Sequence, residues 1–187
     1  VLILAAGMRQ VAELAFAVAM RDYAYEAQKS DPKEQQGEVT IMCSKPDDAT
    51  DQAAPRLAIA EGAFMTRDLT TAPANVLTTT AFADQLAAMS DLGLKVEVLD
   101  EDELAKLGMR TLLCGGQGSD SPSKVVVMSW NGGSKDAAPL AVVGKGVVFD
   151  TGGISLKPAA GMEDMTMDMG GAGVVAGTMR ALALRKA

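Results

Sequence analysis

The sequence contains no histidine. Histidine zinc sites, Ser-His-Asp triads, Cys-His dyads and histidine phosphorelays are therefore excluded, because each of them needs an imidazole. Acid–base or metal chemistry in this chain must use carboxylates, lysines and backbone groups. Cysteine is scarce as well, with only Cys43 and Cys114. Two cysteines make no disulfide framework and suit a reducing cytosol, so we expect a cytoplasmic protein.

Long apolar runs are also absent, since no stretch approaches the roughly 20 residues that span a bilayer. The opening VLILAAG lacks the charged region that begins a signal peptide. Basic side chains are in the minority: 17 Lys and Arg stand against 24 Asp and Glu, a net charge of −7. A surface of that charge does not attract phosphate backbones or anionic lipid, so we predict neither a nucleic-acid nor a membrane partner.

The chain of 187 residues has the size and the 48% hydrophobic content of a soluble globular domain. The chain begins at Val1 rather than methionine and stops within a helical pattern at Ala187. We therefore expect a fragment of a longer protein.

Hydrophobic periodicity predicts alternating helices and strands. The predicted helices cover 11–29, 56–69, 80–92, 101–107 and 168–187, and the predicted strands cover 39–44, 94–99, 124–130 and 139–150. Asp100 with Glu103 has the spacing of a capping box at the start of 101–107, Gly93 is placed for a left-handed helix end, and 115–123 is predicted to be a loop. Residues 139–150 are almost continuously apolar, as in a strand buried on both faces. Residues 46–55 contain two prolines and no periodicity, which is typical of a linker. The expected fold class is α/β, with a mixed, mostly buried sheet flanked by helices.

Charged residues interrupt the apolar run at 139–150 and follow it. Lys145 lies between two glycines, Asp150 ends the predicted strand, and Lys157 and Asp168 come soon after. In open α/β sheets ligands bind at the carboxyl ends of strands, which is where Asp150 is expected. A simple ion pair between Lys145 and Asp150 beside a glycine turn would explain the pattern. A divalent cation would explain it as well, because carboxylates bind such ions and a nearby lysine then loses its proton more easily.

Three segments carry a resemblance to a known family. VGKGVVFDTGGISLKPAAGMEDMTMDMGGAG (143–173) resembles the metal-binding core of the leucine aminopeptidase, or cytosol aminopeptidase, family of two-metal exopeptidases. RDLTTAPANVLTTTAFADQL (67–86) and LGMRTLLCGGQGS (107–119) resemble the beginning of its catalytic domain in the same order. The likeness covers nearly all of residues 56–187.

The resemblance implies a role for each matching residue. Lys145, as a neutral amine, and Asp168 would bind the tighter of two metal ions, and Asp150 would bridge both. Lys157 would stay cationic, polarise the scissile carbonyl and stabilise the oxyanion. Met165 would line the pocket for the first side chain of the substrate. Lysine suits the ligand role because its pKa moves readily on burial, whereas arginine does not lose its proton.

The resemblance also implies an architecture and partners. Residues 1–45 would end a smaller N-terminal α/β domain, 46–55 would be the linker, and 56–187 would be the first part of a zinc-dependent exopeptidase-like catalytic domain. The family hydrolyses peptides with a free N-terminus, works with two ions of zinc, manganese or magnesium, and assembles as cytoplasmic hexamers.

One part of the family pattern is missing from these residues. The second motif of the family, NTDAEGR, supplies further metal ligands and an arginine, and it does not occur in this sequence. A cation held by so few ligands binds weakly. We therefore expect weak metal binding at most, no peptidase activity from this chain alone, and exposed apolar surface where the sheet is truncated.

Two alternatives remain open at this stage. FDTGG (149–153) also fits the phosphate loop of actin-like or sugar-kinase-like folds, although Pro158 follows soon after it. A non-catalytic homologue that acts in assembly or regulation would keep the fold without the chemistry. The presence of all four charged residues favours an enzyme over that second alternative.

Overall fold

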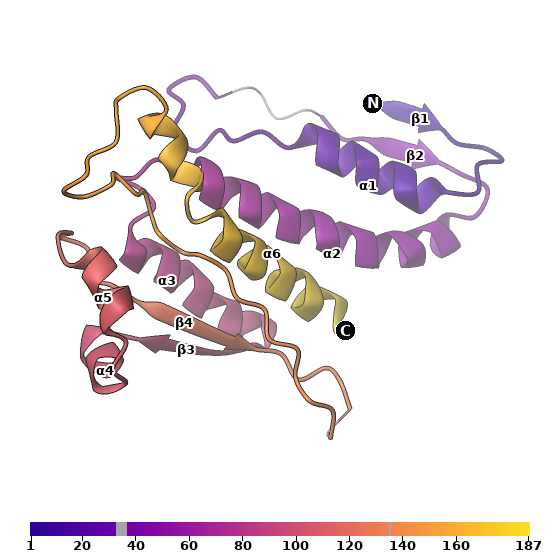
Figure 1. Cartoon of the computed structure of the whole chain (residues 1–187). Helices are drawn as coiled ribbons and strands as arrows, with labels where there is room; N and C mark the ends of the chain where they lie inside the picture. Colours follow the sequence, from indigo (N-terminus) through magenta and orange to yellow (C-terminus); the bar gives the residue numbers. More distant parts are fainter. Residues whose placement is uncertain (33–36, 135) are drawn as a thin grey trace.

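The computed structural model describes residues 1–32, 37–134 and 136–187. Figure 1 shows two long helices, α2 (Pro46–Thr71) and α6 (Gly170–Arg185), running side by side through the middle of the molecule. Strands β1 (Leu2–Leu4) and β2 (Thr40–Met42) and helix α1 (Val11–Asp22) lie on one side of this pair. On the other side lie the remaining elements: α3 (Thr79–Ala87), β3 (Lys95–Leu99), α4 (Glu101–Lys106), α5 (Arg110–Gly116) and β4 (Val125–Ser129). Two 3₁₀ helices, η1 (Ala88–Leu92) and η2 (Met162–Met167), complete the order.

Helix α2 occupies the segment that was predicted to be a linker, so the prediction of a linker at 46–55 is wrong. Pro46 stands at the start of the helix, where its missing N–H costs nothing. Asp47 and Asp48 lie in the first turn, where negative charge favours the helix dipole. Pro55 removes one hydrogen bond inside the helix, and the burial of Ala53 and Ala58 on either side of it holds the helix together. The division into domains at this point stays a prediction.

Helices α2 and α6 approach closely because glycines face each other where they meet. A Cβ added to Gly62 would lie 2.2 Å from the carbonyl oxygen of Gly177, so neither position has room for a side chain. Next to them the Thr66 hydroxyl donates to the carbonyl oxygen of Gly173 at 3.0 Å. The small residues early in α6 are therefore what brings the two helices together.

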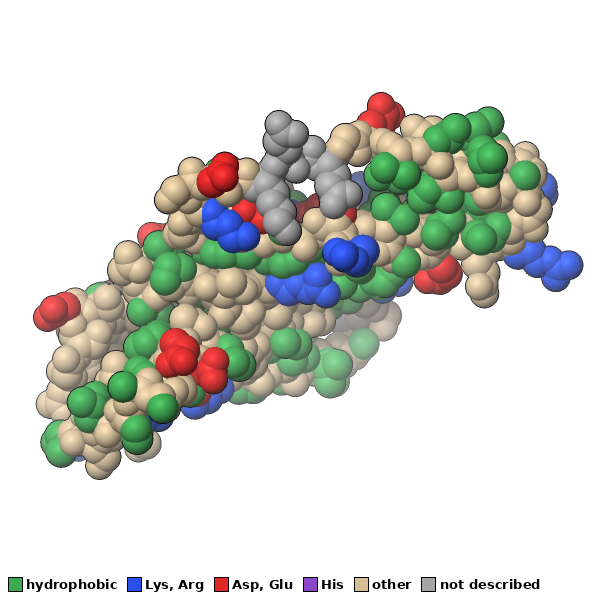
Figure 2. Space-filling view, turned by 90° about the horizontal axis from the view of Figure 1, so that it is seen from above, with side chains coloured by type: hydrophobic (Ala, Val, Ile, Leu, Met, Phe, Trp, Pro, Cys, Tyr) green, Lys and Arg blue, Asp and Glu red, His purple; other side chains and the backbone are tan. Residues whose placement is uncertain are grey.

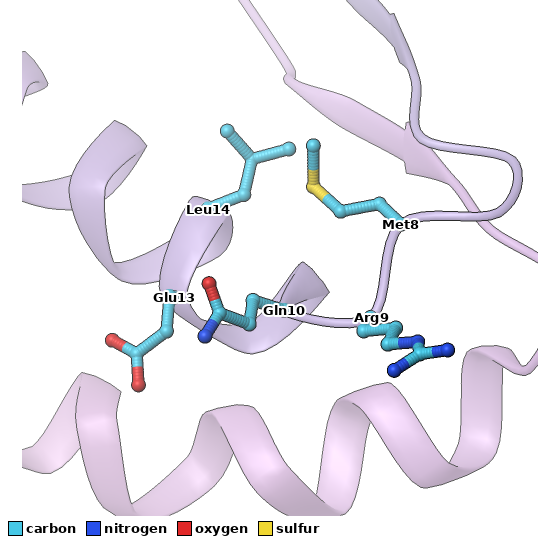
Figure 3. A pocket seen from close by; sticks show the side chains of 5 residues that line it. All are labelled: Met8, Arg9, Gln10, Glu13 and Leu14. Atoms are coloured by element: carbon cyan, nitrogen blue, oxygen red, sulfur yellow. The ribbon is translucent and has the colours of Figure 1, made fainter.

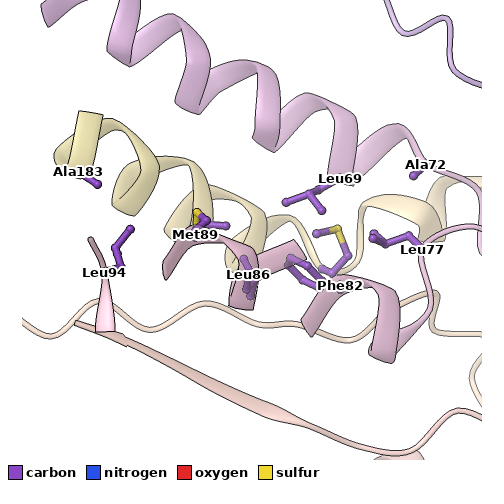
Figure 4. Packing of buried hydrophobic residues seen from close by; sticks show 10 residues of the cluster. Leu69, Ala72, Leu77, Phe82, Leu86, Met89, Leu94 and Ala183 are labelled. Atoms are coloured by element: carbon purple, nitrogen blue, oxygen red, sulfur yellow. The ribbon is translucent and has the colours of Figure 1, made fainter. Parts of the chain in front are cut away.

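The hydrophobic core lies between α2, α3 and α6 (Figure 4). Leu69 from α2, Phe82 and Leu86 from α3, and Met89 from η1 pack together with Met169 just before α6. Leu69 and Met169 are almost completely buried. This cluster joins distant parts of the chain, because residues near 69 and near 169 share one core.

The strands form two separate two-stranded sheets. β1 and β2 pair in parallel, with Ile3 opposite Ile41. β3 and β4 pair in antiparallel register, with Glu97 opposite Val127. The α/β class is thus confirmed, and so are the predicted strands at 39–44, 94–99 and 124–130.

The predicted strand at 139–150 is wrong, because this segment has no strand assignment and no partner strand among the described residues. Leu140 and Val143 are 89% and 93% exposed. A strand needs a neighbour for its N–H and C=O groups, and apolar content alone does not supply one. The exposed apolar surface that we expected is present here. Figure 2 shows a second gathering of hydrophobic side chains over the end that holds β1 and β2, where Leu2, Leu4 and Met42 are exposed.

Most of the residues predicted to begin or end a helix do so in the structure. Helix α4 begins with the expected capping box, in which Asp100 accepts from the Glu103 N–H and the Glu103 side chain accepts from the Asp100 N–H. Gly93 ends η1 with a φ of +90°, a conformation that glycine adopts without strain. Two boundaries differ, since α1 ends at Asp22 rather than near residue 29, and α5 extends into the predicted loop at 115–123. No helix in the described ranges is long and apolar enough to cross a bilayer.

Candidate metal centre

The segment 144–146 lies against the first turn of α6. The N–H of Ala172 donates to the carbonyl oxygen of Lys145 at 2.8 Å. A Cβ on Gly144 would lie 2.3 Å from the carbonyl oxygen of Gly171, and one on Gly171 would lie 2.9 Å from the Lys145 nitrogen. The glycines therefore allow a backbone contact that places Lys145 beside the residues preceding α6.

Lys145 and Asp168 meet at this contact. The Lys145 Nζ lies 2.7 Å from Oδ1 of Asp168. The Asp168 side chain is only 17% exposed, whereas the Lys145 side chain is 57% exposed. The second carboxylate oxygen, Asp168 Oδ2, is buried and has no hydrogen-bond partner among the described residues. A buried carboxylate oxygen without a partner is costly, and it is the kind of group that a cation satisfies.

Asp150 lies on a tight turn that its own side chain stabilises. The Gly152 N–H donates to Asp150 Oδ1 at 2.8 Å, and the Lys157 N–H donates to the Thr151 carbonyl oxygen at 2.9 Å. Gly152 has a φ of +93°, and a Cβ there would lie 2.3 Å from the Ser155 carbonyl oxygen. Glycine is therefore required at this position, and the turn brings Lys157 back to Asp150.

Lys157 contacts Asp150 twice and Met165 once. Its Nζ lies 3.2 Å from Asp150 Oδ2, donates to the Asp150 carbonyl oxygen at 2.8 Å, and donates to Met165 Sδ at 3.1 Å. The Gly152 N–H, followed by the Lys157 ammonium, holds the pKa of Asp150 below its ordinary value. The charge of Lys145 acts in the same direction, so it is felt at Asp150 too.

The four charged site residues thus form two ion pairs, and the fifth predicted residue, Met165, contacts Lys157 of one pair. The pairing differs from the simple interpretation of the sequence, because Lys145 pairs with Asp168 and Asp150 pairs with Lys157. The sequence pattern indicated a tight turn after Asp150. It did not indicate the contact between Gly144 and Gly171. The small residues at the start of α6 are the sequence feature that permits this close approach.

The donor set suits a divalent cation only in part. The described ranges hold no cluster of three or more His, Cys, Asp or Glu side chains that could bind a metal. What they offer is the free oxygen of Asp168, the amine of Lys145 and the nearby carboxylate of Asp150. These groups fit a hard or borderline divalent ion, and they fall short of a complete coordination shell.

Two hollows of the surface lie away from these residues. The one in Figure 3 is lined by Met8, Arg9, Gln10, Glu13 and Leu14, at and just before the start of α1. It contains none of the predicted site residues. Glu13 already pairs with Arg56 of α2 at 2.6 Å, which connects α1 to α2.

Comparison with known proteins identifies the family of the chain. Residues 64–187 match the model of the cytosol aminopeptidase family, catalytic domain. A probable cytosol aminopeptidase from Dinoroseobacter shibae is 65% identical over 186 residues, covering the whole chain and 38% of that relative. The chain thus spans well under half of the length of the curated relatives it matches.

Solved structures show the same fold. The bottromycin maturation enzyme BotP in complex with Mn has a TM-score of 0.77 and 32% identity, over 92% of this chain and 36% of that one. A leucine aminopeptidase from Caenorhabditis elegans has a TM-score of 0.75 and 29% identity, over 97% and 37%. The chain is therefore an α/β domain with the fold of these solved structures. More narrowly, the chain belongs to the cytosol aminopeptidase family.

Proposed function

We propose that this chain carries part of the catalytic centre of a metal-dependent aminopeptidase, which removes N-terminal residues from peptides. The observation that carries the proposal is the buried, unpartnered Asp168 Oδ2 beside Lys145. Family membership supports it, and so does the likeness to BotP, whose structure was solved in complex with Mn. Peptide substrates, two manganese or zinc ions, a hexamer and a cytoplasmic location remain proposals that rest on the family resemblance.

Lys145, Asp150 and Asp168 would hold the metal ions. Asp168 has an oxygen free for this purpose, and Asp150 is held ionised by the Gly152 N–H and by Lys157. Lys145 would bind as a neutral amine, so its present ion pair with Asp168 would be replaced when a cation arrives. Bound divalent ions supply a nucleophilic water and polarise the peptide carbonyl.

Lys157 would act on the substrate directly. Its ammonium lies against the Asp150 carboxylate, and it would donate a hydrogen bond to the scissile carbonyl oxygen and stabilise the charge that develops there. Met165, which is within reach of the same ammonium, would line the pocket for the first side chain. These ligands are too few for tight binding, so the chain alone is expected to bind metal weakly and not to hydrolyse peptides.

Metal binding to the isolated chain tests the ligand assignment. Mn²⁺ titration followed by electron paramagnetic resonance should show weak binding that Asp168→Asn reduces at least tenfold. Asp164→Asn is the matched control, because Asp164 is exposed in η2 four residues earlier. Equal Mn²⁺ binding by the wild type and Asp168→Asn would contradict the assignment.

Activity can be tested in a chimera in which these 187 residues replace the matched segment of the Dinoroseobacter shibae relative. The chimera should release N-terminal residues from peptides, and Lys157→Met should reduce kcat at least a hundredfold, as loss of one oxyanion donor does. A fully active Lys157→Met chimera would refute the role of Lys157.

The competing interpretations gain no support. In a phosphate-loop fold FDTGG would lead directly into a second strand, and no strand follows it among the described residues up to Ala187. The family match also favours a peptidase. A non-catalytic homologue would have no reason to keep both lysines and both aspartates in paired contact.

A further inference from the structure

The ammonium of Lys157 is already surrounded by acceptor atoms in this structure. A lysine ammonium has three N–H donors. Three acceptor atoms surround the Lys157 Nζ: the Asp150 carbonyl oxygen at 2.8 Å, Asp150 Oδ2 at 3.2 Å and Met165 Sδ at 3.1 Å. If Lys157 donates to the carbonyl oxygen of a substrate, as the proposed function requires, one of these contacts must be given up.

The three contacts differ in strength. Two of them are made by oxygens, and one of those oxygens carries a negative charge, which makes its bond to an ammonium comparatively strong. The third is made by a thioether, which is a weak acceptor. An arriving carbonyl oxygen therefore displaces the sulfur at the lowest cost and leaves both contacts to Asp150 in place.

We propose that the Met165 thioether is an exchangeable substitute for the substrate carbonyl oxygen on Lys157. This proposal rests on the proposed function and adds a role for Met165 besides lining the pocket. Before substrate binds, the sulfur holds the third N–H and keeps the ammonium aimed into the site. When substrate binds, the sulfur moves aside and the carbonyl oxygen takes the same proton donor. Met165 is thus a positioning residue.

Methionine suits this exchange better than other residues of similar size. Its side chain has three rotatable bonds, so the sulfur can move away while the backbone of η2 stays in place. Leucine would fill the space without accepting the N–H. Glutamine would accept it through an amide oxygen, which competes with the substrate on equal terms. The series Leu, Met, Gln therefore changes acceptor strength at nearly constant volume.

The first test measures the contact directly and needs no activity. In the 187-residue chain, nuclear magnetic resonance of ¹⁵N-labelled lysine measures how fast the Lys157 NH₃⁺ protons exchange with water. Exchange should accelerate at least threefold in Met165→Leu and should not accelerate in Met165→Gln. Met167→Leu is the matched control, since Met167 is 56% exposed in the same 3₁₀ helix and should leave the rate unchanged. The Lys145 signal reports whether the fold is intact. Equal exchange rates in all three variants would overturn the proposal.

The second test uses the chimera with the Dinoroseobacter shibae relative. Met165→Gln should have a kcat/KM about tenfold below that of Met165→Leu, the ratio that one competing hydrogen bond produces. The loss should lie mainly in KM, because the amide must be displaced before the substrate can bind. Equal kcat/KM in the two variants would overturn the exchange and leave the proposed function intact. A fully active Lys157→Met chimera would instead refute the role of Lys157, and a chimera with the unchanged 187 residues that releases no N-terminal residues from peptides would refute the proposed function itself.

Discussion

The contact between α2 and α6 gives the sharpest prediction about stability. In Gly62→Ala the new Cβ would lie 2.2 Å from the Gly177 carbonyl oxygen, whereas an ordinary contact begins at 3.4 Å. The two backbones must therefore separate locally by the difference, about 1.2 Å. A helix backbone cannot move aside as a flexible side chain can. The added methyl group should therefore lower the free energy of unfolding by about 3 kcal/mol, near the upper end of the cost of placing an extra methyl group in a packed core. Alanine recovers about 1 kcal/mol through its higher helix propensity. We expect a net loss of about 2 kcal/mol in the free energy of unfolding.

Urea unfolding followed by circular dichroism measures this loss, together with a fall in Tm of about 4–8 °C for a chain of this size. Gly115→Ala is the matched control, because Gly115 also lies in a helix and a Cβ there meets nothing within 4 Å. That variant should be as stable as the wild type or more stable. Gly177→Ala should be destabilised like Gly62→Ala, since its Cβ would lie 2.3 Å from the Gly62 carbonyl oxygen.

The double variant tests the mechanism further. Once one Cβ has forced α2 and α6 apart, the second finds part of the space already open, so the combined loss should be smaller than the sum of the two. A Gly62→Ala chain that is as stable as the Gly115→Ala control would refute the close helix contact.

Three other substitutions each remove or disturb a single contact, and their effects can be predicted from it. Tyr23→Phe removes the hydrogen bond from the Tyr23 hydroxyl to Asp68 Oδ1 (2.6 Å) and should lower the free energy of unfolding by about 1 kcal/mol at pH 7. Burial, and then the bond to Asp68, raise the pKa of Tyr23, so this contribution is complete below about pH 10 and is lost as the pH rises further. Urea unfolding from pH 7 to 11 should therefore show the wild type losing stability more steeply than Tyr23→Phe, and parallel curves would contradict this. Asp100→Ala removes the α4 cap and should cost about 1 kcal/mol in the same assay, and an unchanged unfolding midpoint would count against the cap. Gly144→Ala should push Lys145 away from Asp168 and alter Mn²⁺ binding by the chain, and unchanged binding would show that the contact with Gly171 does not position the site.

Structural features that depend only on residues close together in the chain were predictable from the sequence. The capping box of Asp100 and Glu103, the left-handed Gly93 and the strand at 94–99 involve contacts over a few residues, and the structure confirms each of them. The start of α2 was also present as a local signal, in Pro46 and the two aspartates that follow it. It was missed because two prolines and little periodicity are also typical of a linker.

Elements that need a distant partner were not predictable in this way. Residues 139–150 have the composition of a buried strand, yet hydrogen bonding in a sheet depends on a neighbouring strand that composition does not specify. The length of α2 depends on the same kind of contact, since its buried face packs on α6, more than a hundred residues later in the chain.

The sequence by itself determined the order of the lysines and aspartates between residues 145 and 168, and the family resemblance of that stretch predicts that they hold a cation. Tertiary structure alone decided how they are paired. Lys145 reaches Asp168 through the contact of Gly144 with Gly171, and Lys157 reaches Asp150 through the turn at Gly152. The physical reason is that charge and residue type are properties of each position, whereas a distance of 2.7 Å between residues 145 and 168 exists only once α6 has packed against the chain.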